Sequence, residues 1–282
     1  MNNLLIKVDI PIGKTFDGGD RLSYFKVAEV IEGFMKGFVA GSGAKGCVIG
    51  LSGGLDSSTV AHLLVRALGK EKVLGLIMPM SGITRQEDLD DAVSLAEDLG
   101  INYRIIDIRE IFEAYTSANP LFDENDKIAN GNLQARIRMT LLYYAANRKN
   151  LLVAGTSDRS EILLGYFTKY GDGASDFIPI GDLYKTQVRE LARSIGVPDK
   201  IVNKPSSPGL WVGQTAEGEL GLSYDVIDRI LIALFDRKME IDEAAREVGV
   251  SREVVEKVME MCRNSTHKRS LPPKPSVRIL LR

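Results

Sequence analysis

Residues 50–58 read Gly-Leu-Ser-Gly-Gly-Leu-Asp-Ser-Ser, between an apolar run and a stretch with helical spacing. The apolar run at 47–51 predicts a short buried strand, and the pattern at 56–68 predicts a helix. Glycines allow the close backbone approach that a bound anion needs, and the free amides of a helix N-terminus attract negative charge. The segment therefore predicts a phosphate site, although a plain connection capped by Ser or Asp would share this pattern.

The turn differs from a Walker A loop, which ends in Gly-Lys-Ser/Thr. Leu55-Asp56-Ser57 stands at the equivalent place and contains no lysine. A simple kinase or GTPase is therefore disfavoured. An aspartate beside polyphosphate would repel it unless a cation intervenes, so Asp56 is a candidate Mg²⁺ ligand.

Strand-like and helix-like segments alternate along the chain. Further strands are predicted at 73–78, 102–106 and 151–154, and helices at 23–39, 86–99, 107–115, 128–147 and after 157. Such alternation predicts an α/β fold, a parallel sheet with helices on both faces. Ligands of these sheets bind beyond the carboxyl ends of the strands, where the turns at 50–57 and 155–157 both fall.

The remaining segments have a weaker pattern. Residues 168–180 and 203–221 lack periodicity, and loops of this length within a compact domain are either functional or disordered. Residues 223–264 are helical in pattern, and an apolar, strand-like piece follows at 277–281. We interpret 1–282 as one domain, with the sheet core at about 45–200 and a C-terminal helical part and tail at about 220–282.

Composition excludes several classes of protein. With 36 Lys and Arg against 38 Asp and Glu, the net charge of −2 gives no general attraction to nucleic acid or to an anionic membrane. No run of 18 apolar residues occurs, so no membrane span is predicted. Cys47 and Cys262 form no CxxC pair, which favours free thiols in a reducing compartment. We expect a cytoplasmic enzyme.

Two motifs carry a resemblance to known proteins. Ser52-Gly53-Gly54-Leu55-Asp56-Ser57 resembles the SGGxDS turn of the ATP pyrophosphatases, which split ATP between its α and β phosphates. Residues 155–161, Gly-Thr-Ser-Asp-Arg-Ser-Glu, and 165–176, Gly-Tyr-Phe-Thr-Lys-Tyr-Gly-Asp-Gly-Ala-Ser-Asp, resemble the GT…E…G(Y/F)xTKYGDG block of NAD synthetases. The likeness covers roughly 20–270 and implies a Rossmann-like fold of the adenine nucleotide alpha-hydrolase type.

This resemblance implies an ammonia-dependent ligase that converts deamido-NAD (nicotinate adenine dinucleotide) to NAD. ATP and Mg²⁺ would be required, and an adenylated intermediate would release AMP and pyrophosphate. Family members that use glutamine carry an additional amidohydrolase domain, for which the first strand, starting by residue 47, leaves no room. We therefore expect free ammonia or a separate glutaminase subunit to supply the nitrogen.

A homodimer with deamido-NAD at the subunit interface is also implied. The long helix at 128–147 is a candidate interface, but a buried core helix would show the same apolar stripe.

The family pattern also implies roles for individual residues. ATP binding falls to Gly50, Leu51, Ser52, Gly53, Gly54, Leu55, Asp56, Ser57, Arg85, Thr156, Lys185 and Ser207. Mg²⁺ binding falls to Asp56 and Glu161, and deamido-NAD binding to Arg136, Lys169, Asp176, His267 and Lys268. We expect Asp176 to orient ammonia or accept its proton, and Lys185 to act on the leaving pyrophosphate.

Other interpretations of these residues stay open. Taken alone, Arg136 suits a solvated charge on a helix and His267 an exposed residue near a chain end. Glu161 suits a helix N-terminus and Asp176 a turn. A tRNA-modifying adenylating enzyme is one alternative function, but it predicts a basic RNA surface, which is not evident. A nucleotide sensor without chemistry is another, and loss of Asp56 or Glu161 would have indicated it.

Overall fold

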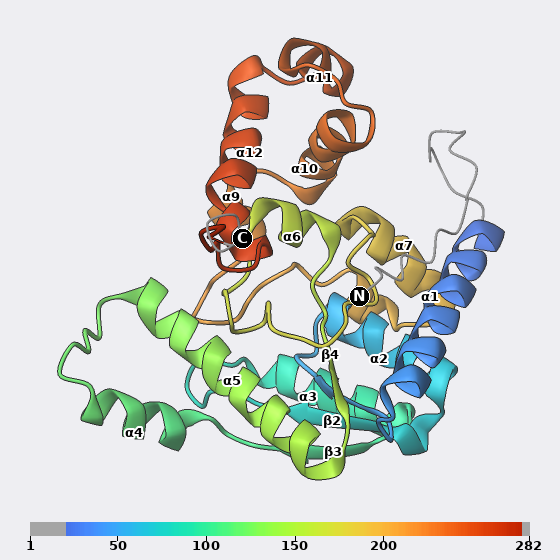
Figure 1. Ribbon diagram of the computed structural model, residues 1–282, viewed down its shortest axis with the longest axis vertical. Coiled ribbons are helices and arrows are strands. Elements are labelled where there is room, and N and C mark those ends of the chain that lie inside the picture. Colours follow the sequence, from blue (N-terminus) through green and yellow to red (C-terminus); the bar gives the residue numbers. More distant parts are fainter. Residues whose placement is uncertain (1–20, 278–282) are drawn as a thin grey trace.

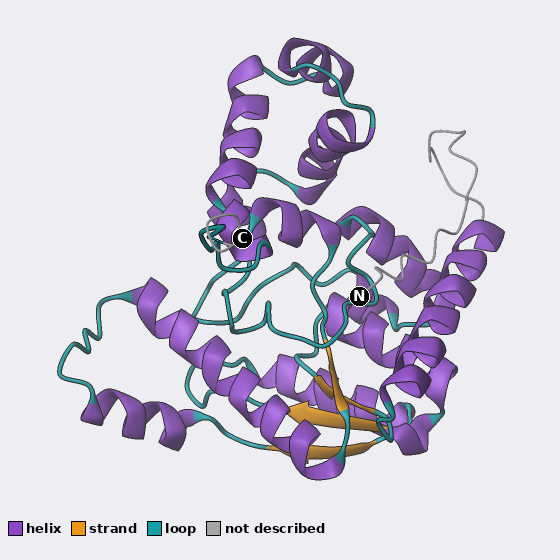
Figure 2. Ribbon diagram, viewed as in Figure 1, coloured by secondary structure: helices purple, strands orange, loops and turns teal. Residues whose placement is uncertain are grey.

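The computed structural model describes residues 21–277, and its centre is a parallel sheet (Figures 1 and 2). The four strands are β1 (Cys47–Gly50), β2 (Val73–Ile77), β3 (Asn102–Ile105) and β4 (Leu152–Ala154), in the order β3-β2-β1-β4. Cys47 of the central strand β1 pairs with Val73 on one side and Leu152 on the other. The α/β fold with a parallel sheet, predicted from the alternating pattern, is confirmed.

Helices surround the sheet and extend the chain beyond it. The first seven are α1 (Arg21–Ser42), α2 (Leu55–Leu68), α3 (Gln86–Asp98), α4 (Arg109–Ala118), α5 (Lys127–Lys149), α6 (Arg159–Leu164) and α7 (Lys185–Ile195), with a 3₁₀ turn at Lys70–Lys72. The others are α8 (Asp199–Val202), α9 (Ala216–Leu220), α10 (Tyr224–Leu231), α11 (Ile241–Val248), α12 (Arg252–Asn264) and α13 (Thr266–Arg269), with a π-helical turn at Ile232–Asp236.

Element boundaries differ from the predicted ones at a few places. The helix expected at 107–115 begins at Arg109 because the Asp107 carboxylate accepts the backbone N–H of Arg109, which holds Asp107 outside the helix. Helix α7 was not predicted, and the expected loop at 203–221 contains the short helix α9. The strand-like piece expected at 277–281 lies, apart from its first residue, outside the described residues.

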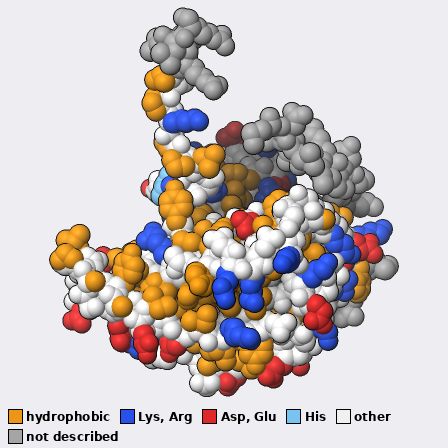
Figure 3. All heavy atoms as spheres, turned by 60° about the horizontal axis from the view of Figure 1, so that its bottom comes forward, with side chains coloured by type: hydrophobic (Ala, Val, Ile, Leu, Met, Phe, Trp, Pro, Cys, Tyr) orange, Lys and Arg blue, Asp and Glu red, His pale blue; other side chains and the backbone are white. Residues whose placement is uncertain are grey.

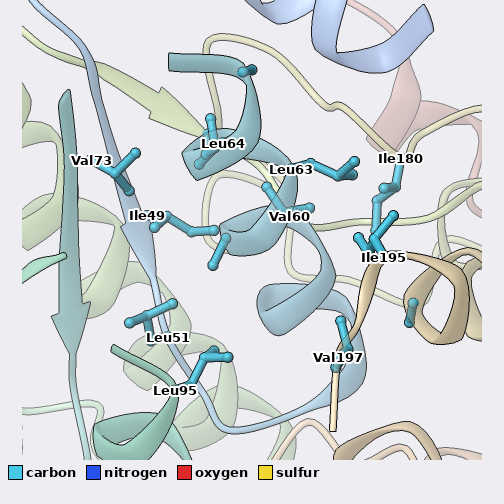
Figure 4. Close-up of a cluster of buried hydrophobic side chains, with 14 of the residues drawn as sticks. Ile49, Leu51, Val60, Leu63, Leu64, Val73, Leu95, Ile180, Ile195 and Val197 are labelled. Atoms are coloured by element: carbon cyan, nitrogen blue, oxygen red, sulfur yellow. The ribbon is translucent and has the colours of Figure 1, made fainter. Parts of the chain in front are cut away.

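Helices cover both faces of the sheet, as predicted. Side chains alternate along β1, so Ile49 points to one face and Val48 to the other. Helices α1, α2, α3 and α7 bury the Ile49 face, where Val60, Leu63 and Ile195 pack together (Figure 4). Helix α5 and the chain before α4 bury the Val48 face. The sheet is therefore fixed from both sides, and its strand ends have defined positions.

A third apolar cluster holds the C-terminal helices α10, α11 and α12 together. Tyr184, just before α7, and Leu164, the last residue of α6, belong to the same cluster. Because α10 packs on both α6 and α7, the C-terminal helices brace the two helices that begin beside the strand ends.

Two smaller expectations also have an outcome in the structure. Cys47 and Cys262 are both buried and free. Among the described residues, no helix is long and apolar enough to span a membrane.

Two glycines allow a paired test of the packing. A Cβ on Gly46, just before β1, would lie 2.1 Å from the backbone oxygen of Lys72, whereas one on the exposed Gly37 of α1 would meet nothing within 4 Å. We expect Gly46→Ala to lower the free energy of unfolding by about 1–3 kcal/mol. Gly37→Ala should raise it by about 0.5–1 kcal/mol through helix propensity. Urea denaturation measures both, and equal effects of the two changes would contradict the packing described.

Candidate active site

A cavity of about 680 Å³ opens at the carboxyl ends of β1, β2 and β4. Its lining includes Gly50, Met78 and Ala154, from the end of each of these strands or just beyond it. Both turns predicted to bind ligand, at 50–57 and 155–157, contribute to the lining, although Gly53 itself does not. The cavity therefore lies where a doubly covered parallel sheet is expected to bind its ligand.

The glycine-rich turn forms the cavity wall at the start of α2. No side chain caps the N-terminus of α2, so its first amides have no side-chain acceptor. The hydroxyls of Ser52 and Ser57 lie 3.0 Å apart, and the Ser52 N–H points to Ser57 Oγ at 3.3 Å. Uncapped amides, two hydroxyls and the helix dipole together make an anion-binding surface.

Beside this turn, one ammonium lies among three carboxylates. Lys185 Nζ is 2.7 Å from an oxygen of Asp56 and 2.8 Å from oxygens of both Asp158 and Glu161. The Lys185 and Asp158 side chains are fully buried, while those of Asp56 and Glu161 are about one-fifth exposed. Ligand oxygens of the three acids lie within 4.8 Å of one another, close enough to hold one metal ion. We call these three carboxylates the acid triad.

Helix starts bring the acid triad together. Asp56 is in the first turn of α2 and Glu161 in the first turn of α6. Asp158 caps α6, because its Oδ1 accepts the Glu161 N–H at 2.8 Å. Lys185 is the first residue of α7. The four charged groups therefore converge because three helices begin at the same edge of the sheet.

A buried hydrogen-bond network holds the start of α7 in place. The hydroxyl of Ser160 accepts the Lys185 N–H at 3.0 Å and donates to Asp228 Oδ1 at 2.5 Å. Asp228, from α10, also accepts the Thr186 N–H at 2.8 Å. The C-terminal helices thus fix the backbone that carries Lys185.

Burial and attraction oppose each other within this charged group. Burial lowers the pKa of Lys185, but attraction to Asp158, Asp56 and Glu161 outweighs it and holds that pKa well above its ordinary value. Burial raises the pKa of Asp158 to about 6, despite the attraction of Lys185. Lys185 is therefore cationic at neutral pH. Its positive charge lowers the pKa of the neighbouring carboxyls and so opposes the effect of their burial.

The residues predicted to bind ATP gather around the cavity. Arg85, Thr156 and Ser207 all line it together with the turn. Arg85 holds Asp88 through two hydrogen bonds of 2.8 Å. The Ser207 hydroxyl donates to the backbone oxygen of Gln214 at 2.6 Å. Lys185 lies behind the lining, in contact with Asp56 and Glu161.

The residues predicted to bind deamido-NAD are divided between two places. Lys268 lines the cavity and donates to the backbone oxygens of Gly165 and Phe167. The other four residues are not part of the described lining: Arg136, Lys169, Asp176 and His267. Arg136 and His267 are exposed.

Two of these outlying residues lie near the α5 side of the sheet. Arg136 donates to the backbone oxygen of Lys169 at 3.3 Å. Asp176 lies along the edge of β4, where its carboxylate accepts the Val153 N–H at 2.7 Å. The deamido-NAD roles and the catalytic role of Asp176 stay predictions.

Sequence reasoning assigned no role to three side chains near the site. Asp158 completes the acid triad, and its place three residues before Glu161, in the block that resembles NAD synthetases, was an available signal. Arg138 lines the cavity and donates to the Met78 backbone oxygen at 3.0 Å, and burial lowers its pKa to about 10. Lys204 lines the cavity and donates to the Gly53 backbone oxygen of the glycine-rich turn. No local sequence pattern indicates this contact.

The Lys185 ammonium should contribute strongly to the free energy of unfolding. We expect Lys185→Met to lower the free energy of unfolding at pH 7.5 by about 3–5 kcal/mol, because it leaves buried carboxylates without a partner. Without Lys185 the pKa of Asp158 should rise further above its ordinary value. A buried carboxyl with a raised pKa destabilises the fold once the pH exceeds that pKa, because the charged form is then buried. The decrease in unfolding free energy caused by Lys185→Met should therefore be smaller at pH 5 than at pH 7.5.

Chemical denaturation at both pH values measures this effect. Lys149→Met, which removes an exposed lysine at the end of α5, is the control and should change stability little at either pH. A loss for Lys185→Met that is the same at both pH values would contradict the electrostatic account.

Comparison with known proteins gives one consistent family. A family model described as NAD synthase matches residues 27–272. An NH(3)-dependent NAD(+) synthetase from Hyperthermus butylicus is 59% identical over 254 residues, covering 90% of this chain and 91% of the relative. A relative with the same name from Archaeoglobus fulgidus is 48% identical, covering 92% of this chain and 100% of the relative.

Solved structures lead to the same family. The NH3-dependent NAD synthetase from Campylobacter jejuni has a TM-score of 0.76 and 34% identity, over 90% of this chain and 99% of that one. A structure titled NMN synthetase, from Francisella tularensis, has a TM-score of 0.79 and 35% identity, over 89% of this chain and 98% of that one. With its fold, its phosphate turn and its acid triad, the chain belongs to the NAD synthase family.

Proposed function

We propose that this protein is a ligase that amidates deamido-NAD with ammonia at the expense of ATP, forming NAD, AMP and pyrophosphate. One observation carries the proposal: the uncapped turn at 50–57 and the acid triad with Lys185 meet at a single cavity. Relatives with 48–59% identity over about nine-tenths of the chain are named NH(3)-dependent NAD(+) synthetases, which supports this substrate and nitrogen source.

We propose Mg²⁺ as the ion that the acid triad would hold. Three carboxylates offer the hard oxygen ligands that Mg²⁺ prefers. Asp56 Oδ1 is buried and has no hydrogen-bond partner, so one ligand atom lacks a counterpart. When all three carboxylates are ionised, they and the Lys185 ammonium carry two net negative charges, which a divalent cation balances. Burial raises the pKa of Glu161 and of Asp158, so binding of the cation would favour their ionised forms. A bound Mg²⁺ would supply charge neutralisation for the polyphosphate.

The protein's own groups suit the first half-reaction. The N-terminus of α2 and the Ser52 and Ser57 hydroxyls would bind the phosphates, and the Lys185 ammonium would stabilise the leaving pyrophosphate. A carboxylate oxygen of deamido-NAD forms a bond to the α-phosphorus, and the bond from that phosphorus to the oxygen of pyrophosphate breaks. The product is a mixed anhydride with AMP.

In the second half-reaction ammonia nitrogen bonds to the carbonyl carbon of the anhydride, AMP leaves with the bonding electron pair, and one proton is released. Water must be kept from the anhydride meanwhile. Leu210, Trp211 and Val212 line the cavity as an apolar wall. Gln134 of α5 donates to the Leu210 backbone oxygen at 3.0 Å and so holds this wall against the helix.

The residues outside the cavity support a dimeric deamido-NAD site. Asp176 lies at the edge of β4, next to Phe177, and α1 places Phe34 and Phe38 against the Phe177 ring. Tyr144 on α5 is 69% exposed. We propose that these apolar side chains of α1 and α5 pair with a second copy of the chain, so that the two subunits together enclose deamido-NAD.

Nicotinate mononucleotide is the alternative substrate, because one of the similar structures is titled NMN synthetase. The two substrates share the pyridine carboxylate, so the same chemistry would amidate either one. Deamido-NAD stays the first choice because the curated relatives are named for NAD. The cytoplasmic location stays a prediction.

The reaction itself is directly testable. With ATP, Mg²⁺ and ammonia, we expect deamido-NAD to give NAD, AMP and pyrophosphate in equal amounts, and nicotinate mononucleotide to react much more slowly. Chromatography of the nucleotides measures all the products. ADP as the nucleotide product would contradict the proposal. Faster amidation of nicotinate mononucleotide than of deamido-NAD would show that the mononucleotide is the substrate.

Neutral variants of the acid triad test the metal proposal. Asp56→Asn and Glu161→Gln keep the side-chain shapes but each remove one charge, so we expect at least about a hundredfold lower kcat/KM. Binding of Mn²⁺ in the presence of ATP, measured by electron paramagnetic resonance, should weaken in parallel. Asp182→Asn is the control, because the Asp182 side chain is 95% exposed and, within residues 21–277, its one ion pair is with Arg159. Unchanged Mn²⁺ binding in both triad variants would contradict the metal assignment.

Dimer formation has its own test. We expect sedimentation velocity to give a dimer for the native chain and a monomer for Tyr144→Glu, which places a charge in the proposed interface. Exposed apolar side chains also surround α4, at the left of Figure 3, and these are not part of the proposed interface. Tyr115→Glu on α4 is therefore the matched control and should remain dimeric. A native monomer, or dissociation of both variants, would contradict the proposed interface.

A further inference from the structure

Lys204 is a nearly buried lysine to which no role has been given so far. It follows α8, and its side chain is only 8% exposed. Its ammonium donates to the Gly53 backbone oxygen at 3.1 Å and to Asp88 Oδ1 at 3.0 Å, and it pairs with Asp91. A single cation thus contacts the glycine-rich turn and two carboxylates of α3.

The contact with Gly53 controls how the turn presents its amides. Gly53 has φ of +72°, and a Cβ there would lie 2.2 Å from the backbone oxygen of Asp88, so the turn is pressed against the start of α3. In a trans peptide the C=O and the following N–H point in opposite directions. Because Lys204 holds the Gly53 oxygen on the α3 side, the Gly54 N–H points away from α3, where it donates to the Ser52 hydroxyl at 3.3 Å. Gly54 lines the cavity and Gly53 does not.

Lys204 also connects this turn to two other parts of the cavity wall. Asp88, which it binds, is the carboxylate that holds Arg85. The residues directly after Lys204, from Pro205 to Gly213, all line the cavity. Movement of Lys204 would therefore affect the glycine-rich turn, the Arg85 side chain and the 205–213 loop together.

We propose that Lys204 is a positioning residue for ATP. By binding the Gly53 carbonyl and the carboxylates of α3, it fixes the Gly53–Gly54 peptide, whose N–H in turn holds the Ser52 hydroxyl at the phosphate-binding turn. It also anchors the 205–213 loop beside the phosphates. This inference rests on the proposed function, because it takes ATP as the ligand of the turn.

A second lysine gives an unusually close control. Lys200 pairs with the same Asp91, at 2.7 Å, but it is 60% exposed and has no contact with the turn. Lys204→Met and Lys200→Met therefore remove the same charge and each remove one ion pair with Asp91. Lys204→Met additionally removes the hydrogen bond to the Gly53 oxygen and the ion pair with Asp88, the two contacts through which Lys204 would position the turn and Arg85.

The experiment measures binding of ATP with Mg²⁺ to each variant by titration calorimetry, without the second substrate. We expect Lys204→Met to weaken binding by at least about tenfold, the effect of losing a charged hydrogen bond that orders the site. Lys200→Met should change it less than about twofold. Lys204→Arg, which keeps a donor at this place, should recover part of the affinity. In steady-state kinetics, KM for ATP should rise while KM for deamido-NAD stays nearly unchanged.

Loss of folding must be separated from loss of positioning. In Lys204→Met the Asp91 carboxylate, which is 6% exposed, keeps Lys200 but loses its nearly buried partner, so the double variant Lys204→Met/Asp91→Asn also removes that carboxylate charge. This double variant should be folded, and its affinity for ATP should remain as low as that of Lys204→Met. Equal ATP affinity of the Lys204 and Lys200 variants would overturn this inference alone. Failure of the native chain to bind ATP would overturn the proposed function instead.

Discussion

The contact of the Lys185 ammonium with three carboxylates is the constraint on which the site depends. Each carboxylate comes from the start of a helix, and the lysine begins a third one, so one charged group joins α2, α6 and α7 at the edge of the sheet. Burying Asp158 without a counter-charge would cost several kcal/mol, and the ammonium removes most of that cost. The charges that stabilise the folded protein are also those that ligands would contact: the carboxylates would bind a divalent ion, and the ammonium would attract polyphosphate. Stability and ligand binding therefore draw on one set of groups.

Two further sets of hydrogen bonds fix the backbone around the acid triad and the glycine-rich turn. Ser160 and Asp228 fix the first residues of α7 from the side of the C-terminal helices. On the opposite side of the cavity, Lys204 fixes the glycine-rich turn against α3. The ATP end of the cavity is thus braced from two sides. The segment that carries Asp176 lies instead at the sheet edge, in contact with Tyr143 of α5 and, through Phe177, with Phe34 and Phe38 of α1. That difference agrees with a nucleotide site built within one chain and a second substrate site that needs a partner.

The sequence was informative where chemistry is local. Alternating apolar runs predicted all four strands to within two residues, and the glycine-rich turn was located because its function depends on consecutive residues. Asp56 and Glu161 were named as metal ligands from two motifs, and the structure brings their carboxylates to one place. Asp158 and Lys204 were given no role because their importance comes from contacts across the fold. The hydrogen bond from Lys204 to the Gly53 oxygen spans 151 positions, and no periodicity or spacing predicts such a contact.

Whether a pyridine carboxylate attacks the α-phosphorus of ATP in this cavity is the central question. Deamido-NAD labelled with ¹⁸O in its carboxylate, converted with unlabelled ATP and ammonia, answers it by mass spectrometry of the nucleotide products. The account predicts one labelled oxygen in AMP and none in pyrophosphate, since the carboxylate oxygen that bonds to phosphorus leaves with AMP. Label in inorganic phosphate, or AMP free of label, would contradict it.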